Sequence, residues 1–285
     1  MLTVPVRLMT ESDLAAADEL RRLAGWNQTQ EDWARLLALA PTGCFVAEVG
    51  STIAGTVTTT AYGNTLAWLG MMLVHPQHRR QGIGTALMES ALAHLKRREV
   101  ACIKLDATPA GFPLYTQLGF VAEWTLTRWQ LEEKPDLRRR LSSQTRALED
   151  EDWPAIETMD FQVLGASRAQ VLWHLARGSA SSRVWPAKGP ISGWGLLRPG
   201  AFASYLGPVV CSNPEGASSL VADLLGACAQ GQVFWDIPDK NEVATRLAVE
   251  LSFQRVRPLT RMRLGSDSSL GGPQAQIGIA DPAFG

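Results

Sequence analysis

The clearest hydrophobic pattern in the chain is an apolar run followed by a helical repeat. Residues Leu66–Val74 form a nearly unbroken apolar segment, which is typical of a strand covered on both faces. Further on, apolar residues recur at the i, i+3, i+4 and i+7 spacing of one helix face, at Met88, Ala91, Leu92 and Leu95. Between the two lies a basic, glycine-spaced segment, His75–Ala86. The pattern predicts a strand, a basic loop and an amphipathic helix, in that order.

The loop has the composition of a phosphate-binding turn. Gly82 and Gly84 let the backbone approach a ligand closely, and the helix amides that follow point outward at the positive end of the helix dipole. Its Arg-x-x-Gly-x-Gly spacing differs from the glycine motifs of dinucleotide-binding and nucleotide-hydrolysing folds. It resembles the acetyl-CoA loop of the GNAT superfamily of N-acetyltransferases, Gln/Arg-x-x-Gly-x-Gly/Ala. The resemblance implies acetyl-CoA binding by a continuous stretch: Arg79, Arg80, Gln81, Gly82, Ile83, Gly84 and Thr85.

A second match to the same family follows the helix. Ala101–Asp106 is patterned as a strand, and Phe112–Gly119 as a short helix whose final glycine suits a left-handed cap. The pattern Tyr-x-x-x-Gly-Phe resembles the GNAT segment in which a tyrosine is the general acid, and by position that residue is Tyr115. A phenol with a pKa of about 10 can protonate the leaving thiolate of CoA. The alternative is a core tyrosine whose hydroxyl contacts any nearby acceptor.

The resemblance also implies the fold class, an α/β fold with a twisted, mostly antiparallel mixed sheet and flanking helices. In that fold the strand at 66–74 splays away from its neighbour near Ile103, and pantetheine inserts like a false strand. Backbone groups of Leu73 and Val74 are therefore candidates for binding the cofactor. No carboxylate lies in the strand to serve as a general base, so the base is water or one of four side chains: Asp106, Glu48, His75 and His78.

The second half of the chain repeats the first. Arg7–Leu14 matches Arg146–Trp153, and Trp68–Gly70 matches Tyr205–Gly207. Three further pairs match: Ile53–Gly55 with Ile191–Gly193, Gly119-Phe120 with Ser252-Phe253, and Leu126–Leu131 with Leu259–Leu264. Two copies of one fold are the simplest account, and they resemble tandem-GNAT proteins with a diverged second half. We expect a catalytic domain at 1–133, a charged, Pro-containing linker at 134–144 and a degenerate GNAT-like domain with a C-terminal tail at 145–285.

The two copies differ most in the phosphate loop. Val210 and Val221 are three residues closer together than their counterparts Val74 and Met88. The shortened segment, Cys211–Gly216, has no arginine, keeps one glycine and gains a glutamate, whose charge is unfavourable beside a pyrophosphate. Tyr115 aligns with Ala248. We therefore expect one active site, with the second domain either shaping the acceptor pocket or serving as structural support.

Composition excludes several other classes of function. The chain has a net charge of −1 and a pI of about 6.4, which argues against nucleic-acid binding despite the run Arg138–Arg140. No signal sequence or membrane span is apparent, and the four cysteines lie in apolar elements without metal-ligand spacing: Cys44, Cys102, Cys211 and Cys228. We expect a cytoplasmic monomer or homodimer with reduced thiols, no metal and no membrane partner. Ala275–Ala280 alternates enough to form a terminal strand.

The acceptor is the least determined part of the prediction. Trp26 and Trp33, with Glu31 or Asp32, are candidates for binding an amine by cation–π and ionic contacts, although such tryptophans more often pack in a core. Asp106 is a further candidate for contact with the acceptor. The leading hypothesis is an acetyl-CoA-dependent N-acetyltransferase that acts on a small-molecule amine by direct attack in a ternary complex. One alternative is a non-catalytic acyl-CoA sensor. Another is a protein or peptide N-acetyltransferase, which would need an open peptide groove.

Overall fold

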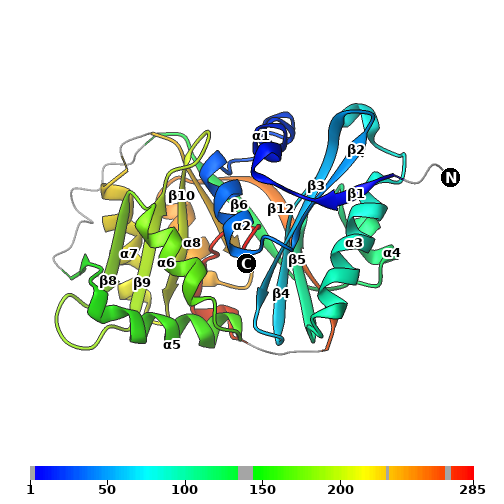
Figure 1. Ribbon diagram of the computed structural model, residues 1–285. Coiled ribbons are helices and arrows are strands. Elements are labelled where there is room, and N and C mark those ends of the chain that lie inside the picture. The colour runs from blue at the N-terminus through cyan, green and yellow to red at the C-terminus, as the bar shows by residue number, and fades with distance from the viewer. Residues whose placement is uncertain (1–3, 134–143, 229–230, 267–270) are drawn as a thin grey trace. The chain divides into compact units, whose positions relative to one another are not determined.

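The chain forms two compact units that do not follow consecutive halves of the sequence. The computed structural model describes residues 4–133, 144–228, 231–266 and 271–285 (Figure 1). The first unit comprises residues 1–121, 262–266 and 282–284, and the second comprises 122–261, 267–281 and 285. Short segments near the C-terminus thus belong to the first unit. The expected linker at 134–144 lies, except for its last residue, outside the described residues.

The first unit contains a mixed sheet whose strands are β1 (Val6–Leu8), β2 (Cys44–Val49), β3 (Thr52–Tyr62), β4 (Leu66–Val74) and β5 (Cys102–Ala107). These strands follow one another in the sheet, and the end of β12 (Gln254–Gly265) comes next to β5. The pairings are antiparallel except for β4 with β5, which is parallel. The helices are α1 (Leu14–Leu23), α2 (Gln30–Leu39), α3 (Ile83–Arg97) and α4 (Phe112–Gln117), with 3-10 turns at Glu11–Asp13 and Pro76–His78.

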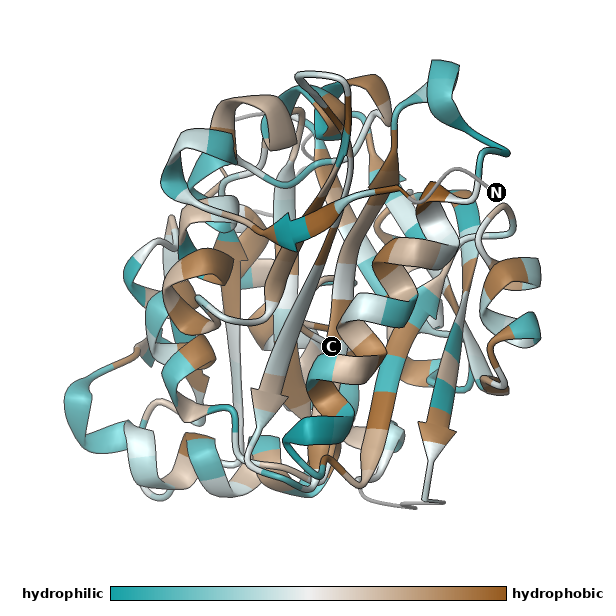
Figure 2. Cartoon of the chain, turned by 45° about the vertical axis from the view of Figure 1, so that its right-hand side comes forward, coloured by the Kyte–Doolittle hydropathy of each residue, from teal (hydrophilic) through white to brown (hydrophobic). Residues whose placement is uncertain are grey.

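The core of this unit lies between the sheet and α3. The predicted helix face is buried against alternate residues of β4 and β5, including Leu69 and Leu105. Met262 and Leu264 from the end of β12 complete this cluster. In Figure 2 apolar segments, in brown, recur along the strands and helices, and several turns are hydrophilic. The predicted strand at 66–74 is confirmed to the residue, and Gly119 has the left-handed backbone expected after α4, with φ +89°.

The second unit repeats this architecture. Its strands are β6 (Val121–Leu131), β7 (Arg146–Ala147), β8 (Ser181–Trp185), β9 (Gly193–Arg198), β10 (Ser204–Cys211), β11 (Val233–Pro238), the first part of β12, and β13 (Gln276–Gly278). The order is β12-β6-β11-β10-β9-β8-β7, with β13 beside β10. Its helices are α5 (Trp153–Leu164), α6 (Ala169–Arg177), α7 (Pro214–Gly226) and α8 (Glu242–Glu250), with 3-10 turns at Asp150–Asp152 and Pro273–Ala275.

The internal repeat is visible in side-chain geometry as well as in topology. Arg7 donates to Asp13 at 2.7 and 2.9 Å, and Arg146 donates to Asp152 at 2.7 Å through each terminal nitrogen. Each aspartate also accepts from the backbone N–H three residues before it, which caps the helical turn that follows. The same ion pair therefore begins both copies.

The strands β6 and β12 match between the two copies, and part of each belongs to the unit that is formed mainly by the other half of the chain. Except for its first residue, β6 belongs to the second unit, where it pairs antiparallel with β11 over Leu126–Leu131. The end of β12, Met262–Ser266, belongs to the first unit, where the Ser266 N–H donates to the Ala101 carbonyl at 3.0 Å. The expectation of consecutive domains at 1–133 and 145–285 did not include this exchange.

The remaining expectations concern the cysteine thiols, the C-terminal strand and membrane-spanning helices. All four cysteines are free and buried, and burial raises the pKa of the Cys44 thiol to about 12. The terminal strand expected at 275–280 is present as β13, Gln276–Gly278. Among the described helices, none combines the length and apolar composition needed to cross a membrane.

Candidate active site in the first unit

The loop between β4 and α3 leaves the start of a long helix open. Gly82 is the residue before α3, and no side chain caps the helix there. Gly82 has φ +82° and Arg80 has φ +62°, both in the left-handed region, so the loop turns sharply twice before the helix begins. The side chains of Arg79, Arg80 and Gln81 are exposed. The first helix amides and two guanidinium groups are thus available to an anion.

Contacts within the loop hold this opening in place. The Arg79 Nε donates to the Val74 carbonyl at 3.4 Å, and the Gln81 side-chain amide donates to the Gln77 carbonyl at 3.3 Å. Gly84 packs closely in the first turn: a Cβ there would lie 3.2 Å from Met72 Cε and 3.3 Å from Leu114 Cδ2, so these side-chain ends would have to shift slightly. Gly82 provides the turn before the helix.

The edge of β4 nearest this loop is not paired with β5. The parallel pairing covers only Leu66–Trp68 with Cys102–Lys104, although β4 continues to Val74. A bulge opposite β3 falls in the same stretch, and its residue Met71 has φ +48°. The Thr56 hydroxyl donates to the Met71 carbonyl at 2.8 Å and holds the bulge. Beyond Trp68 the two strands diverge, so backbone groups up to Leu73 and Val74 border a gap in the sheet.

Tyr115 lies on α4 and packs into the core of the first unit. Its side chain is buried, and its ring contacts Phe120 edge to face at 6.0 Å between centroids. Gly111 permits this position, since a Cβ there would lie 2.9 Å from Tyr115 Cε2. Its hydroxyl makes no hydrogen bond to any residue that the structure describes, and burial raises the pKa of Tyr115 above its usual value. The phenol therefore keeps its proton near neutral pH.

The four side chains considered as a general base differ in availability. Glu48 is bound by Arg7 at 2.7 Å, and the His75 Nδ1 accepts from the Gln77 N–H at 3.3 Å. His78 lies beside His75, with 5.5 Å between ring centroids. Asp106 is half-buried near the end of β5, where alternation places it opposite Leu105, a residue of the α3-side core. None of these arrangements selects one residue as the base.

The predicted acceptor-binding residues lie in different environments. Trp33 is fully buried, which favours packing over direct ligand contact. Trp26 and Asp106 are half-buried. Sequence reasoning missed two buried threonines on β3, Thr58 opposite Gly70 and Thr60 opposite Trp68, whose hydroxyls have no hydrogen-bond partner among the described residues. The threonine-rich sequence around them gave no signal of this.

The corresponding loop of the second unit is closed by its own residues. Asn213 precedes α7, and its side-chain oxygen accepts from the backbone N–H groups of Glu215 at 2.9 Å and Gly216 at 3.0 Å. The Trp185 ring crowds the same turn, since a Cβ on Gly216 would lie 2.7 Å from it. The amides that an anion would need are thus already bound, and Glu215 adds a negative charge.

The gap in the sheet of the second unit is also filled. β10 and β11 pair in parallel only at Ser204-Tyr205 with Val233-Phe234, and beyond this point β13 pairs antiparallel with β10. The Trp235 indole N–H donates to the Ile277 carbonyl at 3.0 Å, and the Ile279 N–H donates to the Asp236 carbonyl at 3.1 Å. A strand of the protein thus lies where the first unit has unpaired backbone. The bulge of β10 includes Pro208, which has no N–H to donate.

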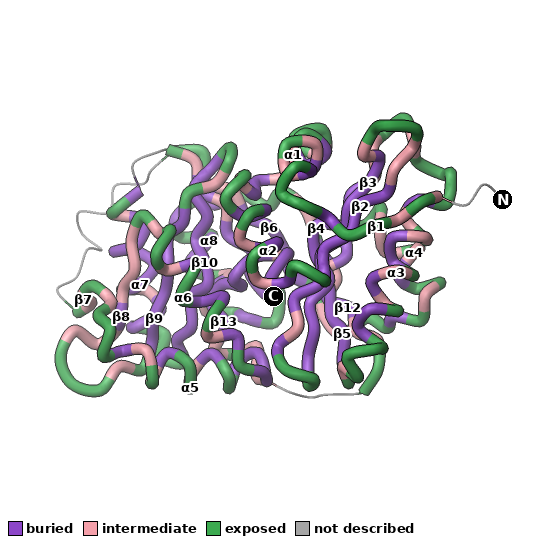
Figure 3. Tube along the Cα trace, in the orientation of Figure 1, coloured by how far each residue is buried: buried purple, intermediate pink, exposed green. Residues whose placement is uncertain are grey.

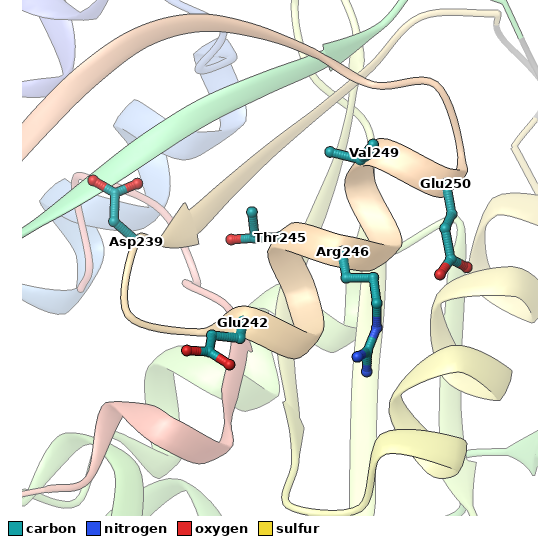
Figure 4. A pocket seen from close by; sticks show the side chains of 6 residues that line it. All are labelled: Asp239, Glu242, Thr245, Arg246, Val249 and Glu250. Atoms are coloured by element: carbon teal, nitrogen blue, oxygen red, sulfur yellow. The ribbon is translucent and has the colours of Figure 1, made fainter.

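The helix that matches α4 carries no acid group toward the core. Ala248, the counterpart of Tyr115, is fully buried on α8. A hollow of about 350 Å³ lies on α8, lined by Asp239, Glu242, Thr245, Arg246, Val249 and Glu250 (Figure 4). Three carboxylates and one guanidinium surround it, a balance that disfavours a phosphate. Figure 3 shows that strands β10 and β9 of this unit are largely buried.

Among the residues that the structure describes, no group of three or more His, Cys, Asp or Glu side chains is placed to hold a metal ion.

A model of a known protein family matches each half of the chain. The model described as the acetyltransferase (GNAT) family matches residues 10–120, and one described as an acetyltransferase (GNAT) domain matches residues 156–277. The uncharacterized N-acetyltransferase YitH of Bacillus subtilis is 22% identical over 191 residues, which are 67% of this chain and 67% of that protein.

Solved structures match the full length. A candidate acetyltransferase from Pyrococcus horikoshii has a TM-score of 0.86 and 25% identity, and the match covers 100% of this chain and 97% of that chain. A tandem GNAT protein from the clavulanic acid biosynthesis pathway has a TM-score of 0.64 and 15% identity, over 98% of this chain and 100% of that chain. At that lower identity the likeness concerns the fold alone.

Proposed function

Because the chain belongs to the GNAT family of N-acetyltransferases and carries two domains of that family, we propose that it transfers an acetyl group from acetyl-CoA to the primary amine of a small molecule. The proposal places the single active site in the first unit. The observation that carries it is the uncapped start of α3 beside the unpaired edge of β4. In the second unit both features are occupied by the chain itself.

The residues of the first unit fit acetyl-CoA in three respects. The amides of Ile83, Gly84 and Thr85 would bind pyrophosphate oxygens, and Arg79 and Arg80 would neutralise part of their charge. The unpaired backbone of β4 near Leu73 and Val74 would satisfy the amides of the pantetheine arm. The bulge at Met71 redirects the backbone within the same stretch, where an N–H can face a developing oxyanion.

Tyr115 would supply the proton that the leaving group needs. When the acceptor nitrogen forms its bond to the acetyl carbon, the carbon–sulfur bond breaks and the electron pair goes to sulfur. A neutral phenol beside that sulfur protonates it, and the proton lost by the amine passes to water or to a base such as Asp106. Tyr115 carries its proton before transfer, because burial raises the pKa of the phenol above its usual value.

The acceptor is proposed to be a small amine, with Trp26 and Asp106 near it. Cation–π and ionic contacts of these side chains suit an ammonium group before it loses its proton. The second unit would shape the acceptor pocket or support the first unit. We place the protein in the cytoplasm, as a monomer or homodimer.

Release of free CoA thiol from acetyl-CoA, measured across amines, amino acids, polyamines, aminoglycosides and peptides, tests the proposal. We expect acceptor-dependent release with at least one class of small amine. Tight CoA binding with no release for any acceptor would favour the sensor alternative. Release with peptides alone would favour a protein N-acetyltransferase.

A further inference from the structure

A hollow lies on the first unit at one end of the helix pair formed by α1 and α2. Its volume is about 600 Å³, and its lining comes from residues 9–14, at the start of α1, and 34–41, at the end of α2. The segment that joins the two helices, residues 24–29, contains Trp26, the proposed acceptor contact, and belongs to the other end of the pair. The hollow is therefore distinct from the proposed active site.

The hollow has an apolar wall and one polar edge. The wall consists of Met9, Leu14, Ala34, Leu37, Ala38 and Pro41. Ala34, Ala38 and Pro41 are exposed, so a ligand can reach the wall from solvent. Thr10 and Glu11 form the edge. Glu11 is exposed, and among the described residues its carboxylate has no ion pair and no hydrogen bond. Apolar walls with a few polar groups are the usual composition of a small-molecule site.

The second unit carries bulkier residues at the corresponding positions of its own helix pair. Helices α5 and α6 repeat α1 and α2, and three counterparts are larger: Trp153 corresponds to Leu14, Trp173 to Ala34 and Arg177 to Ala38. The Arg177 guanidinium lies over the Trp173 ring, 4.1 Å from its centroid. The second unit thus supplies aromatic rings and a cation from its own chain where the first unit has small or aliphatic side chains beside a hollow.

We propose that the hollow of the first unit is a binding site for a small aromatic molecule that carries a positive charge. The apolar wall buries the aromatic ring, as a ligand counterpart of the tryptophans that the second unit carries. The carboxylate of Glu11 at the edge pairs with the cation, which is the counterpart of Arg177. Because the hollow lies apart from the active site, this site does not rest on the proposed function.

Isothermal titration of the full chain with benzyltrimethylammonium, without acetyl-CoA, tests the site. This quaternary cation has no N–H and cannot accept an acetyl group, so its binding is not that of a substrate. We expect a dissociation constant below about 1 mM. Tetramethylammonium, which lacks the ring, should bind about 10-fold more weakly or worse, because it buries much less apolar surface. Benzyl alcohol, which lacks the charge, should bind about 2- to 5-fold more weakly, as expected for an exposed ion pair.

The repeat itself provides variants that fill the hollow. Leu14→Trp with Ala34→Trp introduces the residues that α5 and α6 already carry, and it should weaken binding about 10-fold or more while the melting temperature stays the same or rises. Ala15→Trp is the matched control, because Ala15 is exposed on α1 and does not line the hollow. Glu11→Gln should remove the preference for the cation over benzyl alcohol, whereas Glu89→Gln, at an exposed position of α3, should leave it unchanged.

Three results would refute the site. The first is that benzyltrimethylammonium binds no better than tetramethylammonium, and the second is that the double-tryptophan variant binds it as well as the unchanged chain. The third is an equal loss of binding in Ala15→Trp, which would mean that added bulk on α1 rather than a filled hollow prevents binding. A preference for the cation that survives Glu11→Gln would overturn the role of that carboxylate. CoA binding and thiol release depend on none of these results, so the proposed function is tested separately.

Discussion

The β4–α3 segment of the first unit and the β10–α7 segment of the second are corresponding parts of the repeat. The first leaves its helix start and its strand edge open, whereas the second closes both. In the first, Gly82 leaves the start of α3 uncapped, and β4 runs six residues past its last partner on β5, from Trp68 to Val74. In the second, Asn213 caps α7 and β13 pairs with the open edge of β10. Both units keep the same bulge in the preceding strand pair.

The difference shows that one fold can leave the backbone at a helix start and a strand edge open in one copy and closed in the other. Polar backbone at a helix start and at an open strand edge must be satisfied by something, whether a ligand or the chain itself. In the second unit the side chain of Asn213 and the strand β13 take these roles, and the ring of Trp185 crowds the same turn. This unit also lacks counterparts of Arg79 and Tyr115.

Removal of the phenol hydroxyl should give the largest effect. Tyr115→Phe should lower turnover about 100-fold or more, because the leaving thiolate loses its proton donor, while the dissociation constant for CoA changes less than about twofold. Steady-state kinetics and CoA titration measure the two quantities. Tyr62→Phe is the matched control: it removes a buried hydroxyl that donates to the Phe284 carbonyl at 2.7 Å. Equal losses in both variants would remove Tyr115 from the mechanism.

Charge reversal in the loop should weaken CoA binding next most strongly. Arg79→Glu with Arg80→Glu places two negative charges beside the pyrophosphate and should raise the dissociation constant about 100-fold. Arg97→Glu with Arg98→Glu is the matched control, because these residues lie at the far end of α3 and the change leaves the β4–α3 loop intact. Titration with CoA at constant ionic strength compares the two double variants. A similar loss in both would mean that only overall charge matters.

The repeated ion pair predicts matched losses of stability. Asp13→Asn and Asp152→Asn should each lower the free energy of unfolding by about 1–2 kcal/mol at neutral pH. Hydrogen bonds from Arg7 lower the pKa of Asp13 to about 2, and those from Arg146 lower the pKa of Asp152. Because the pKa is lower in the folded chain, the ionised carboxylate stabilises the fold above a pH of about 4, and this stabilisation is lost as the pH falls toward 2. Denaturant unfolding between pH 2 and 7 should show the Asp13→Asn difference shrinking in that range.

The cap of the second unit should give the smallest effect. Asn213→Ala frees the amides of Glu215 and Gly216 and should cost about 1 kcal/mol of unfolding free energy. It should create no CoA site, because β13 still fills the strand edge and Glu215 still repels phosphate. Thermal unfolding and CoA titration of this variant check both statements. A second equivalent of bound CoA would show that the cap alone closes the site.

Much of this comparison was readable in the sequence. The apolar run at 66–74, the glycines of the loop and the repeat all act locally, and they predicted β4, α3 and the second copy. The missing arginines and the shortened Cys211–Gly216 loop predicted a closed counterpart. Long-range features were not readable: the exchange of β6 and β12, and the entry of β13 beside β10, depend on which strand edges remain open after folding.

Calorimetric titration of the full chain with CoA tests the central claim most directly, since it counts sites. The account predicts one equivalent of CoA bound by the unchanged chain, and no detectable binding at the same concentrations once Arg79 and Arg80 are both replaced by glutamate. Two equivalents, or one equivalent that survives the double replacement, would contradict a single site in the first unit.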